Sequence, residues 1–134
     1  MILRVFLAFY GGMKSVSSGF YFNWGMTYAR WGQPMKAMFY LNRAAKLNTK
    51  GAHIYYQRAL LLIAMGQPES AINDFGAAIE ADPKHMDAYL NRSMMHALVG
   101  RQGKAQDDVE KAVALGADRS SLESRIAELR DQVG

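Results

Sequence analysis

The side chains that most often carry chemistry are few in this chain of 134 residues, and they are scattered. The chain has no cysteine, which excludes disulfides, thiolate metal sites and cysteine nucleophiles. His53, His85 and His96 do not have the i, i+4 spacing that places two metal ligands on one helix face. Asp107 and Asp108 are adjacent, so on a helix their carboxylates would point apart.

The serines and glycines do not suggest catalysis either. No serine lies in a Gly-x-Ser-x-Gly turn, and Gly11, Gly12 and Gly19 do not form a phosphate-binding loop. We therefore expect a protein that is not an enzyme, with no catalytic residue, no metal site and no cofactor.

Charge and aromatic residues are distributed unevenly along the chain. Residues 1–68 contain eight basic residues and no acidic one, whereas residues 69–134 contain eight basic and twelve acidic residues. Eleven of the fifteen aromatic residues lie in residues 1–40. This polarity points to an acidic partner, an anionic membrane surface or head-to-tail self-association, with a solvated surface of no function as the alternative. Nucleic acid is disfavoured, because the basic residues are scattered over many helical phases.

No apolar stretch approaches the roughly 20 residues that a membrane-spanning helix needs. The apolar run over residues 1–10 is a poor signal peptide, because its apolar core is short and no clear small-x-small cleavage site follows. We expect a cytoplasmic protein, with a periplasmic or a membrane-associated one as the alternatives.

A repeat of 34 residues organises the rest of the chain into units over residues 18–51, 52–85 and 86–117. We number the positions of each unit from its first residue and call them places. Six places recur in residue type: one is aromatic, three are small, one is glycine and one is a larger apolar residue. The recurring residues are Tyr21, Tyr55 and Tyr89 at place 4; Gly25, Ala59 and Ser93 at place 8; Gly32, Gly66 and Gly100 at place 15; Ala37, Ala71 and Ala105 at place 20; Leu41, Phe75 and Val109 at place 24; and Ala44, Ala78 and Ala112 at place 27.

Each recurring place has a physical role in a helical hairpin. Small residues at places 8 and 20 let two antiparallel helices approach closely, and alanine at place 27 lets the next hairpin pack. Glycine at place 15 can adopt the left-handed conformation that ends a helix. Pro34 and Pro68 follow where a second helix begins. The pattern predicts helices over residues 19–31, 35–47, 53–65, 69–80, 86–99 and 103–115.

A seventh helix is expected over residues 120–132, within a capping segment of residues 118–134. Ser120 and Glu123 match a capping box at its start. Apolar residues recur at helical spacing along one face and charged residues along the other, as the end of a repeat stack requires. The apolar residues are Leu122, Ile126, Leu129 and Val133.

This pattern resembles the tetratricopeptide repeat family over residues 18–117. The resemblance implies an all-α, right-handed solenoid of three hairpins closed by the capping helix. Places 7 and 23 should face each other within a hairpin. Ion pairs are therefore expected between Arg58 and Asp74 and between Arg92 and Asp108, with Trp24 beside Tyr40 in the first unit.

The resemblance also implies a concave groove, lined by the first helix of each unit, that binds a protein or peptide. The residues expected there are apolar, with a row of carboxamides that can pair with an extended peptide backbone. Some of them could instead pack against neighbouring helices. The expected groove residues are Phe22, Asn23, Met26, Tyr56, Gln57, Leu60, Asn91 and Met94.

Some members of the family hold the acidic C-terminus of heat-shock chaperones with a clamp of lysine and asparagine. That clamp requires lysine and asparagine where this chain has Phe22 and Met26, and a further lysine where it has Asp87. The sequence therefore disfavours a chaperone tail as the partner.

Residues 1–17 form an apolar segment ahead of the repeats. They are expected to cover the open end of the first unit, to lie in a groove of this chain or a neighbour, or to contact a membrane peripherally through residues 1–10. Self-association as a homodimer ranks first, because the exposed end of the first unit is also aromatic. The expected interface residues are Phe6, Phe9, Tyr10, Phe20 and Trp31.

Two functions follow. The first is a scaffold or adaptor that binds an extended, largely apolar peptide in its groove. The second is a structural self-assembly module joined through the basic, aromatic half.

Overall fold

The computed structural model describes residues 17–134, and every described element of regular structure is a helix. The predictions for residues 1–16, including Phe6, Phe9 and Tyr10, lie outside the described residues. The first helix runs over residues 17–30. The other helices are α2 (Pro34–Leu47), α3 (Ala52–Ala64), α4 (Pro68–Ala81), α5 (Met86–Leu98), α6 (Gln102–Ala114) and α7 (Arg119–Val133).

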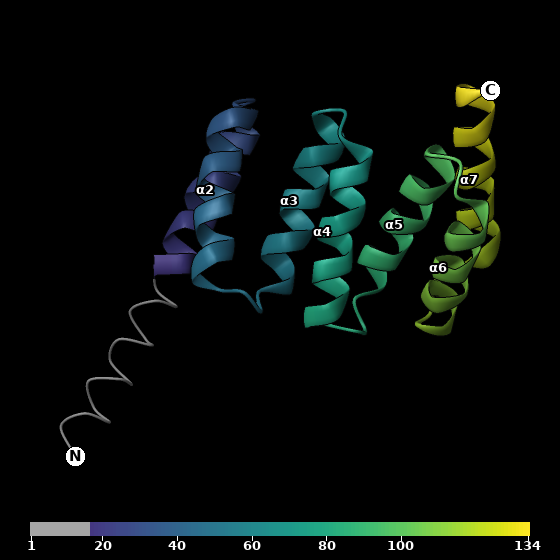
Figure 1. Ribbon diagram of the computed structural model, residues 1–134. Helices are drawn as coiled ribbons and strands as arrows, with labels where there is room; N and C mark the ends of the chain where they lie inside the picture. Colours follow the sequence, from purple (N-terminus) through teal and green to yellow (C-terminus); the bar gives the residue numbers. More distant parts are fainter. Residues whose placement is uncertain (1–16) are drawn as a thin grey trace, which may run out of the picture.

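The helices stand side by side in the order of the sequence, as Figure 1 shows, from the first helix and α2 at one end to α7 at the other. They form three antiparallel hairpins followed by a single terminal helix. The all-α solenoid of three hairpins with a cap is therefore confirmed. The observed helices begin and end within two residues of those expected.

The turn inside each hairpin is built on one glycine. Gly32, Gly66 and Gly100 have φ angles of 68°, 74° and 84°, which residues with a Cβ rarely adopt. The residue after each glycine donates its N–H back to the last turn of the preceding helix, as in the bond of 2.9 Å from Gln33 N to Tyr28 O. This is the Schellman arrangement, and it satisfies carbonyl groups that the end of the helix would leave free.

Small residues let the two helices of a hairpin approach closely. Gly25 is buried, and a Cβ added there would lie 2.9 Å from the side chain of Leu41 on α2. The other small residues at places 8, 20 and 27 of the three units are likewise buried. These residues are Ala37, Ala44, Ala59, Ala71, Ala78, Ser93, Ala105 and Ala112.

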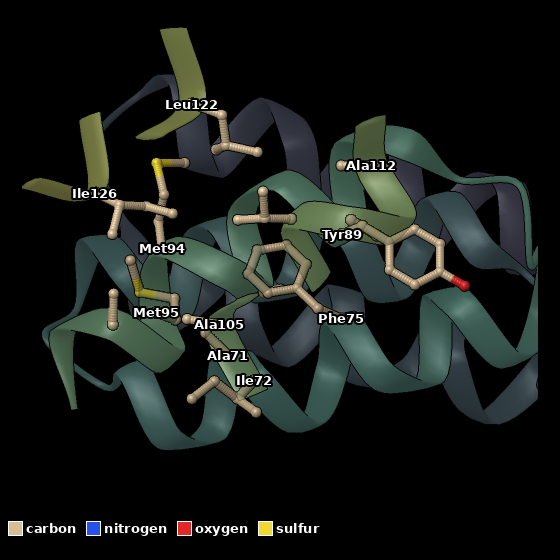
Figure 2. Close-up of a cluster of buried hydrophobic side chains, with 14 of the residues drawn as sticks. Ala71, Ile72, Phe75, Tyr89, Met94, Met95, Ala105, Ala112, Leu122 and Ile126 are labelled. Carbon is tan, nitrogen blue, oxygen red and sulfur yellow. The ribbon is translucent and has the colours of Figure 1, made fainter. Parts of the chain in front are cut away.

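The main core joins the second and third units to α7. Phe75 is fully buried, and Leu122 and Ile126 of α7 are 2% and 7% exposed. Figure 2 shows side chains from α4, α5, α6 and α7 meeting in this cluster. A smaller cluster of Ala44, Ala45 and Ile54 joins the first unit to the second. The capping helix therefore completes the core of the last hairpin.

The start of α7 differs from the expectation. Its N-cap is Asp118, whose carboxylate accepts a hydrogen bond of 2.9 Å from Ser121 N, and the helix begins at Arg119 rather than at Ser120. Glu123 does not close a capping box, because the box position three residues after Asp118 is Ser121; the Glu123 carboxylate lies 3.5 Å from the Arg119 guanidinium instead. Val133, expected on the buried stripe, is 61% exposed.

Candidate functional site

Ion pairs fix how the first and second helices of a unit face each other. Arg58 donates two hydrogen bonds to Asp74, of 2.7 and 2.8 Å, and confirms the first expected pair. Arg92 donates two bonds of 2.7 Å to Asp108 and confirms the second. Hydrogen bonding to each carboxylate raises the pKa of its arginine, while burial acts in the opposite sense. These pairs hold the helices that carry the predicted groove, and their charges are already satisfied.

The first unit replaces this ion pair with aromatic rings. The ring centroids of Trp24 and Tyr40 are 6.5 Å apart, and Tyr40 also stacks on Tyr28 at 5.3 Å. The expected aromatic contact is therefore present. It extends into a larger group of rings at this end of the stack.

Most residues predicted to line the groove are half-buried, a state that leaves surface for a ligand. The exceptions are Asn23, which is exposed, and Met94, which is 8% exposed. The half-buried residues are Phe22, Met26, Tyr56, Gln57, Leu60 and Asn91.

The expectation for Met94 needs correction. Met94 lies in the core beside Ile126 of the capping helix, as Figure 2 shows. The capping helix packs mainly on α5, the first helix of the third unit, and less on α6. The capping helix therefore covers a place at which the sequence predicts a groove residue.

Side chains of neighbouring first helices contact one another directly. The Phe22 ring packs edge-on against the His53 ring of α3, with centroids 4.8 Å apart. Further along, Asn91 Nδ2 on α5 donates a hydrogen bond of 3.2 Å to the Tyr56 hydroxyl on α3. The structure thus brings Tyr56 and Asn91 together and Phe22 next to the second unit.

Tyr56 and Asn91 form a hydrogen-bonded polar pair within the row of predicted groove residues. Burial raises the pKa of Tyr56, the Asp87 carboxylate adds to that effect, and the Asn91 bond opposes it. The hydroxyl therefore keeps its proton at neutral pH and can donate it. The other N–H of Asn91 bonds to Asp87 O at 2.8 Å, which fixes the amide, and its Oδ1 accepts no hydrogen bond from the described part of the chain. The pair can offer one donor and one acceptor to a peptide backbone.

His96 is a packed histidine, as expected from its place, with 6% of its surface exposed. Its Nε2 lies 3.8 Å from Asp108, and its buried Nδ1 has no hydrogen-bond partner within the described chain. Burial lowers the pKa of His96, whereas the Asp108 carboxylate acts to raise it. A cavity of about 400 Å³ next to it is lined by residues of both signs, including Arg92, Lys104 and Asp107.

The end of the stack formed by the first unit is aromatic and exposed. Phe20 and Trp31, both predicted as interface residues, are 56% and 62% exposed, and Phe39 and Met35 on α2 are 56% and 72% exposed. Sequence reasoning missed Met35 and the basic Arg43, although Met35, Phe39 and Arg43 follow at i, i+4 spacing along α2. That spacing is the signal that could have identified a continuous stripe.

Neither a metal site nor a membrane span appears in the described residues. Across residues 17–134, histidine, aspartate and glutamate do not cluster in a group that could hold a metal ion. In the same part of the chain, each helix is too short or too polar to cross a bilayer.

Comparison with known proteins agrees with this architecture. The sequence pattern described as "Tetratricopeptide repeat" matches residues 18–50 and 52–85. The tetratricopeptide domain of Arabidopsis OM64 has a similar structure, with a TM-score of 0.77 and 24% identity over 89% of this chain and 98% of that domain. A search of curated proteins finds no match.

Two further solved structures of similar fold are described as binding peptides. The first tetratricopeptide domain of Spaghetti (RPAP3), solved with the HSP90 peptide SRMEEVD, has a TM-score of 0.78 and 14% identity over 89% of this chain and 94% of its own length. YrrB, described as having an unusual peptide-binding site, has a TM-score of 0.71 and 27% identity over 81% of this chain and 56% of its length. With half of its residues matched by the sequence pattern and the hairpin fold in place, the chain belongs to the tetratricopeptide repeat family.

Proposed function

We propose that this protein is a scaffold that binds an extended, largely apolar segment of a partner protein along the first helices of its three units. The observation that carries the proposal is the row of half-buried apolar and carboxamide side chains on those helices, with Tyr56 and Asn91 joined across two of them. Solved tetratricopeptide domains of similar fold include several with bound peptides, which supports a binding role.

The row suits an extended peptide for two reasons. Phe22, Met26 and Leu60 leave apolar surface that varied side chains can cover, and methionine adapts to different shapes. The Tyr56 hydroxyl and the Asn91 carboxamide can replace the water that a peptide N–H and C=O lose on binding. Binding through such residues needs neither catalysis nor a cofactor.

The test starts from peptides selected against the full chain from a random library. Their affinities are then measured by fluorescence anisotropy for the wild type and for the double variant Y56A/N91A. We expect the variant to bind about tenfold to thirtyfold more weakly, because two central contacts are lost. N73A/Q106A is the matched control, because Asn73 and Gln106 are exposed on the second helices α4 and α6.

The outcome that rejects the proposal is equal affinity of Y56A/N91A and the wild type. The control should bind as the wild type does. Light scattering must show the same mass for all three proteins, so that a change in assembly does not imitate a lost contact.

Self-association is the second candidate, and the exposed Phe20 and Trp31 favour it. A homodimer through this end would bury both side chains in an apolar contact. The test is to measure the mass in solution of the wild-type full chain and of the F20S/W31S variant by light scattering. A dimer that the substitutions convert to a monomer supports this candidate, and a wild-type monomer rejects it.

A further inference from the structure

One surface of the first unit faces away from the second unit. In the second and third units, the corresponding surface is covered by the preceding hairpin. In the second unit, Arg58 at place 7 donates a hydrogen bond to Asn42 on the preceding α2. In the third unit, Arg92 at the same place lies beside Gly76 on the preceding α4. Trp24 occupies this place in the first unit, and within residues 17–134 no hairpin precedes it. Among residues 17–134, this surface is therefore the end of the stack that no other unit covers.

Aromatic rings cover this surface in a connected set. Along the first helix, the Phe20 and Trp24 centroids are 6.4 Å apart, Trp24 and Tyr28 are 5.9 Å apart, and Tyr28 and Trp31 are 5.6 Å apart. Phe39 joins the set from α2. Exposed large side chains usually occur singly, so a connected set marks a contact surface. We call the residues Phe20, Trp24, Trp31, Met35, Phe39, Arg43 and Lys46 the end face.

The end face is basic as well as aromatic. Arg43 lies over the rings of Tyr21 and Phe39, 5.5 and 5.7 Å from their centroids. Arg43 and Lys46 also line a cavity of about 330 Å³ with Tyr21. No acidic residue occurs before Glu69, so nothing in the first unit neutralises these cations.

The charge of the end face distinguishes between the partners that could bind to it. Two copies joined face to face would bring two sets of unneutralised cations together, so the charge of this face favours an anionic surface over the second copy considered above. A head-to-tail contact would need a matching apolar surface at the α7 end, where Leu122 and Ile126 are buried. Among the described residues, the large apolar side chains left exposed there are Leu115 and Val133, neither of them aromatic. The partner that complements the end face has a negatively charged surface with an apolar layer directly beneath it.

We infer that the end face binds the surface of a membrane containing anionic lipids. Aromatic side chains are favoured at the membrane–water boundary, and neighbouring lysine and arginine are attracted to anionic headgroups. Phe20, Phe39 and Trp31 would enter the boundary layer, while Arg43 and Lys46 would reach lipid phosphates beside them. The contact is peripheral and differs from the predicted peptide groove, so the protein could bind a partner while held at a membrane.

The test measures binding of the full chain to vesicles by co-sedimentation. Vesicles of phosphatidylcholine alone are compared with vesicles that also contain phosphatidylglycerol. We expect binding only to the second kind, and a loss of binding as salt is raised, because salt screens the attraction. Equal binding to both kinds, or binding to neither, would overturn the inference.

Two pairs of variants then locate the contact. R43Q/K46Q should bind anionic vesicles about thirtyfold more weakly than the wild type at low salt. K104Q/K111Q is its matched control, because it removes the same charge from exposed positions of α6. If both variants lose affinity equally, net charge alone drives binding and the end face is not the site.

The aromatic contribution is tested in the same assay. F20S/F39S should bind about tenfold more weakly, whereas L115S/V133S removes exposed apolar side chains from the other end and should bind as the wild type does. Circular dichroism checks that each variant keeps its helices. Unchanged binding of F20S/F39S would move the contact to another part of the chain. A wild-type dimer that F20S/F39S converts to a monomer would assign the face to a second copy instead.

Discussion

The Arg92 guanidinium and the Asp108 carboxylate form a paired contact in which two N–H groups meet two oxygens, each at 2.7 Å. The Arg92 side chain is 24% exposed, and the Asp108 side chain 5%. Two parallel charge-assisted bonds fix an orientation that a single ion pair does not. The contact therefore restrains how α5 and α6 face each other as well as contributing stability.

Removing Asp108 should destabilise the fold by about 2 kcal/mol, because two charge-assisted bonds are lost while the partly exposed Arg92 can regain water. The experiment is urea unfolding of D108A, R92A and the double variant. The coupling energy from this cycle should be about 1–2 kcal/mol.

The double variant R92W/D108Y tests whether the aromatic pair of the first unit can replace the ionic pair of the third. Because Trp24 and Tyr40 fill the same two places, it should be more stable than D108A. A coupling energy near zero would show that the ionic pair does not stabilise the fold. An R92W/D108Y variant less stable than D108A would show that the aromatic and ionic pairs are not equivalent.

The burial of His96 predicts a loss of stability in mild acid. Burial lowers the pKa of His96 in the folded protein, so the unfolded chain binds a proton more readily. The stability that depends on neutral His96 is therefore fully present above the ordinary histidine pKa of the unfolded chain. It is lost as the pH falls from that pKa to the lowered pKa of His96 in the folded protein.

The comparison for His96 is H96L, because leucine stands at the same place of the second unit as Leu62. Between about pH 7.5 and about pH 5.5, the melting temperature of the wild type should fall more than that of H96L. Parallel melting curves over this range would contradict the prediction.

The glycine of the second hairpin should resist substitution for conformational reasons alone. Gly66 has φ of 74°, and a Cβ added there would touch nothing within 4 Å. G66A should therefore cost about 1 kcal/mol through backbone strain, without any clash.

Gly103 gives the opposite expectation within the same protein. Gly103 is the second residue of α6 and has open space around it, so G103A should stabilise the fold by about 0.5 kcal/mol, the lower end of the value for a helix interior. Urea unfolding measures both changes. A neutral G66A would show that the turn can adopt another conformation at little cost.

The sequence predicted the fold closely because the same local rules repeat in each unit. Gly32, Gly66 and Gly100 each end a helix, and small residues such as Ala71 each mark a close helix contact. Three independent occurrences of one pattern specify where helices begin, end and meet far better than a single occurrence can.

The candidate site was predicted less completely, because packing around the repeats does not repeat. Met94 has the place of a groove residue, yet α7 covers it by packing on α5. The N-cap of α7 is Asp118, whose carboxylate accepts a hydrogen bond from Ser121 N, so the helix starts before Ser120 and Glu123 lies too far along it to close a box. Both differences depend on how α7, which lies outside the repeats, packs against the last hairpin.

The residues at the clamp positions predict which peptides this chain rejects. Phe22 and Met26 are apolar, and Asp87 is an exposed carboxylate, where the chaperone-binding pattern needs lysine and asparagine. An acidic peptide would meet no cation at these places and would be repelled by Asp87. The wild type should therefore show no saturable anisotropy change with the labelled peptide SRMEEVD, which is bound in a solved domain of similar fold.

The triple variant F22K/M26N/D87K should gain measurable affinity for SRMEEVD at low salt, because it supplies two lysines and removes the repelling carboxylate. The matched control N73K/D107K adds the same net charge at exposed positions of α4 and α6. Affinity gained by the triple variant and not by the control would place these three residues along one binding surface. Equal affinity of both variants would mean that SRMEEVD senses only net charge, and that Phe22 and Asp87 do not share a groove.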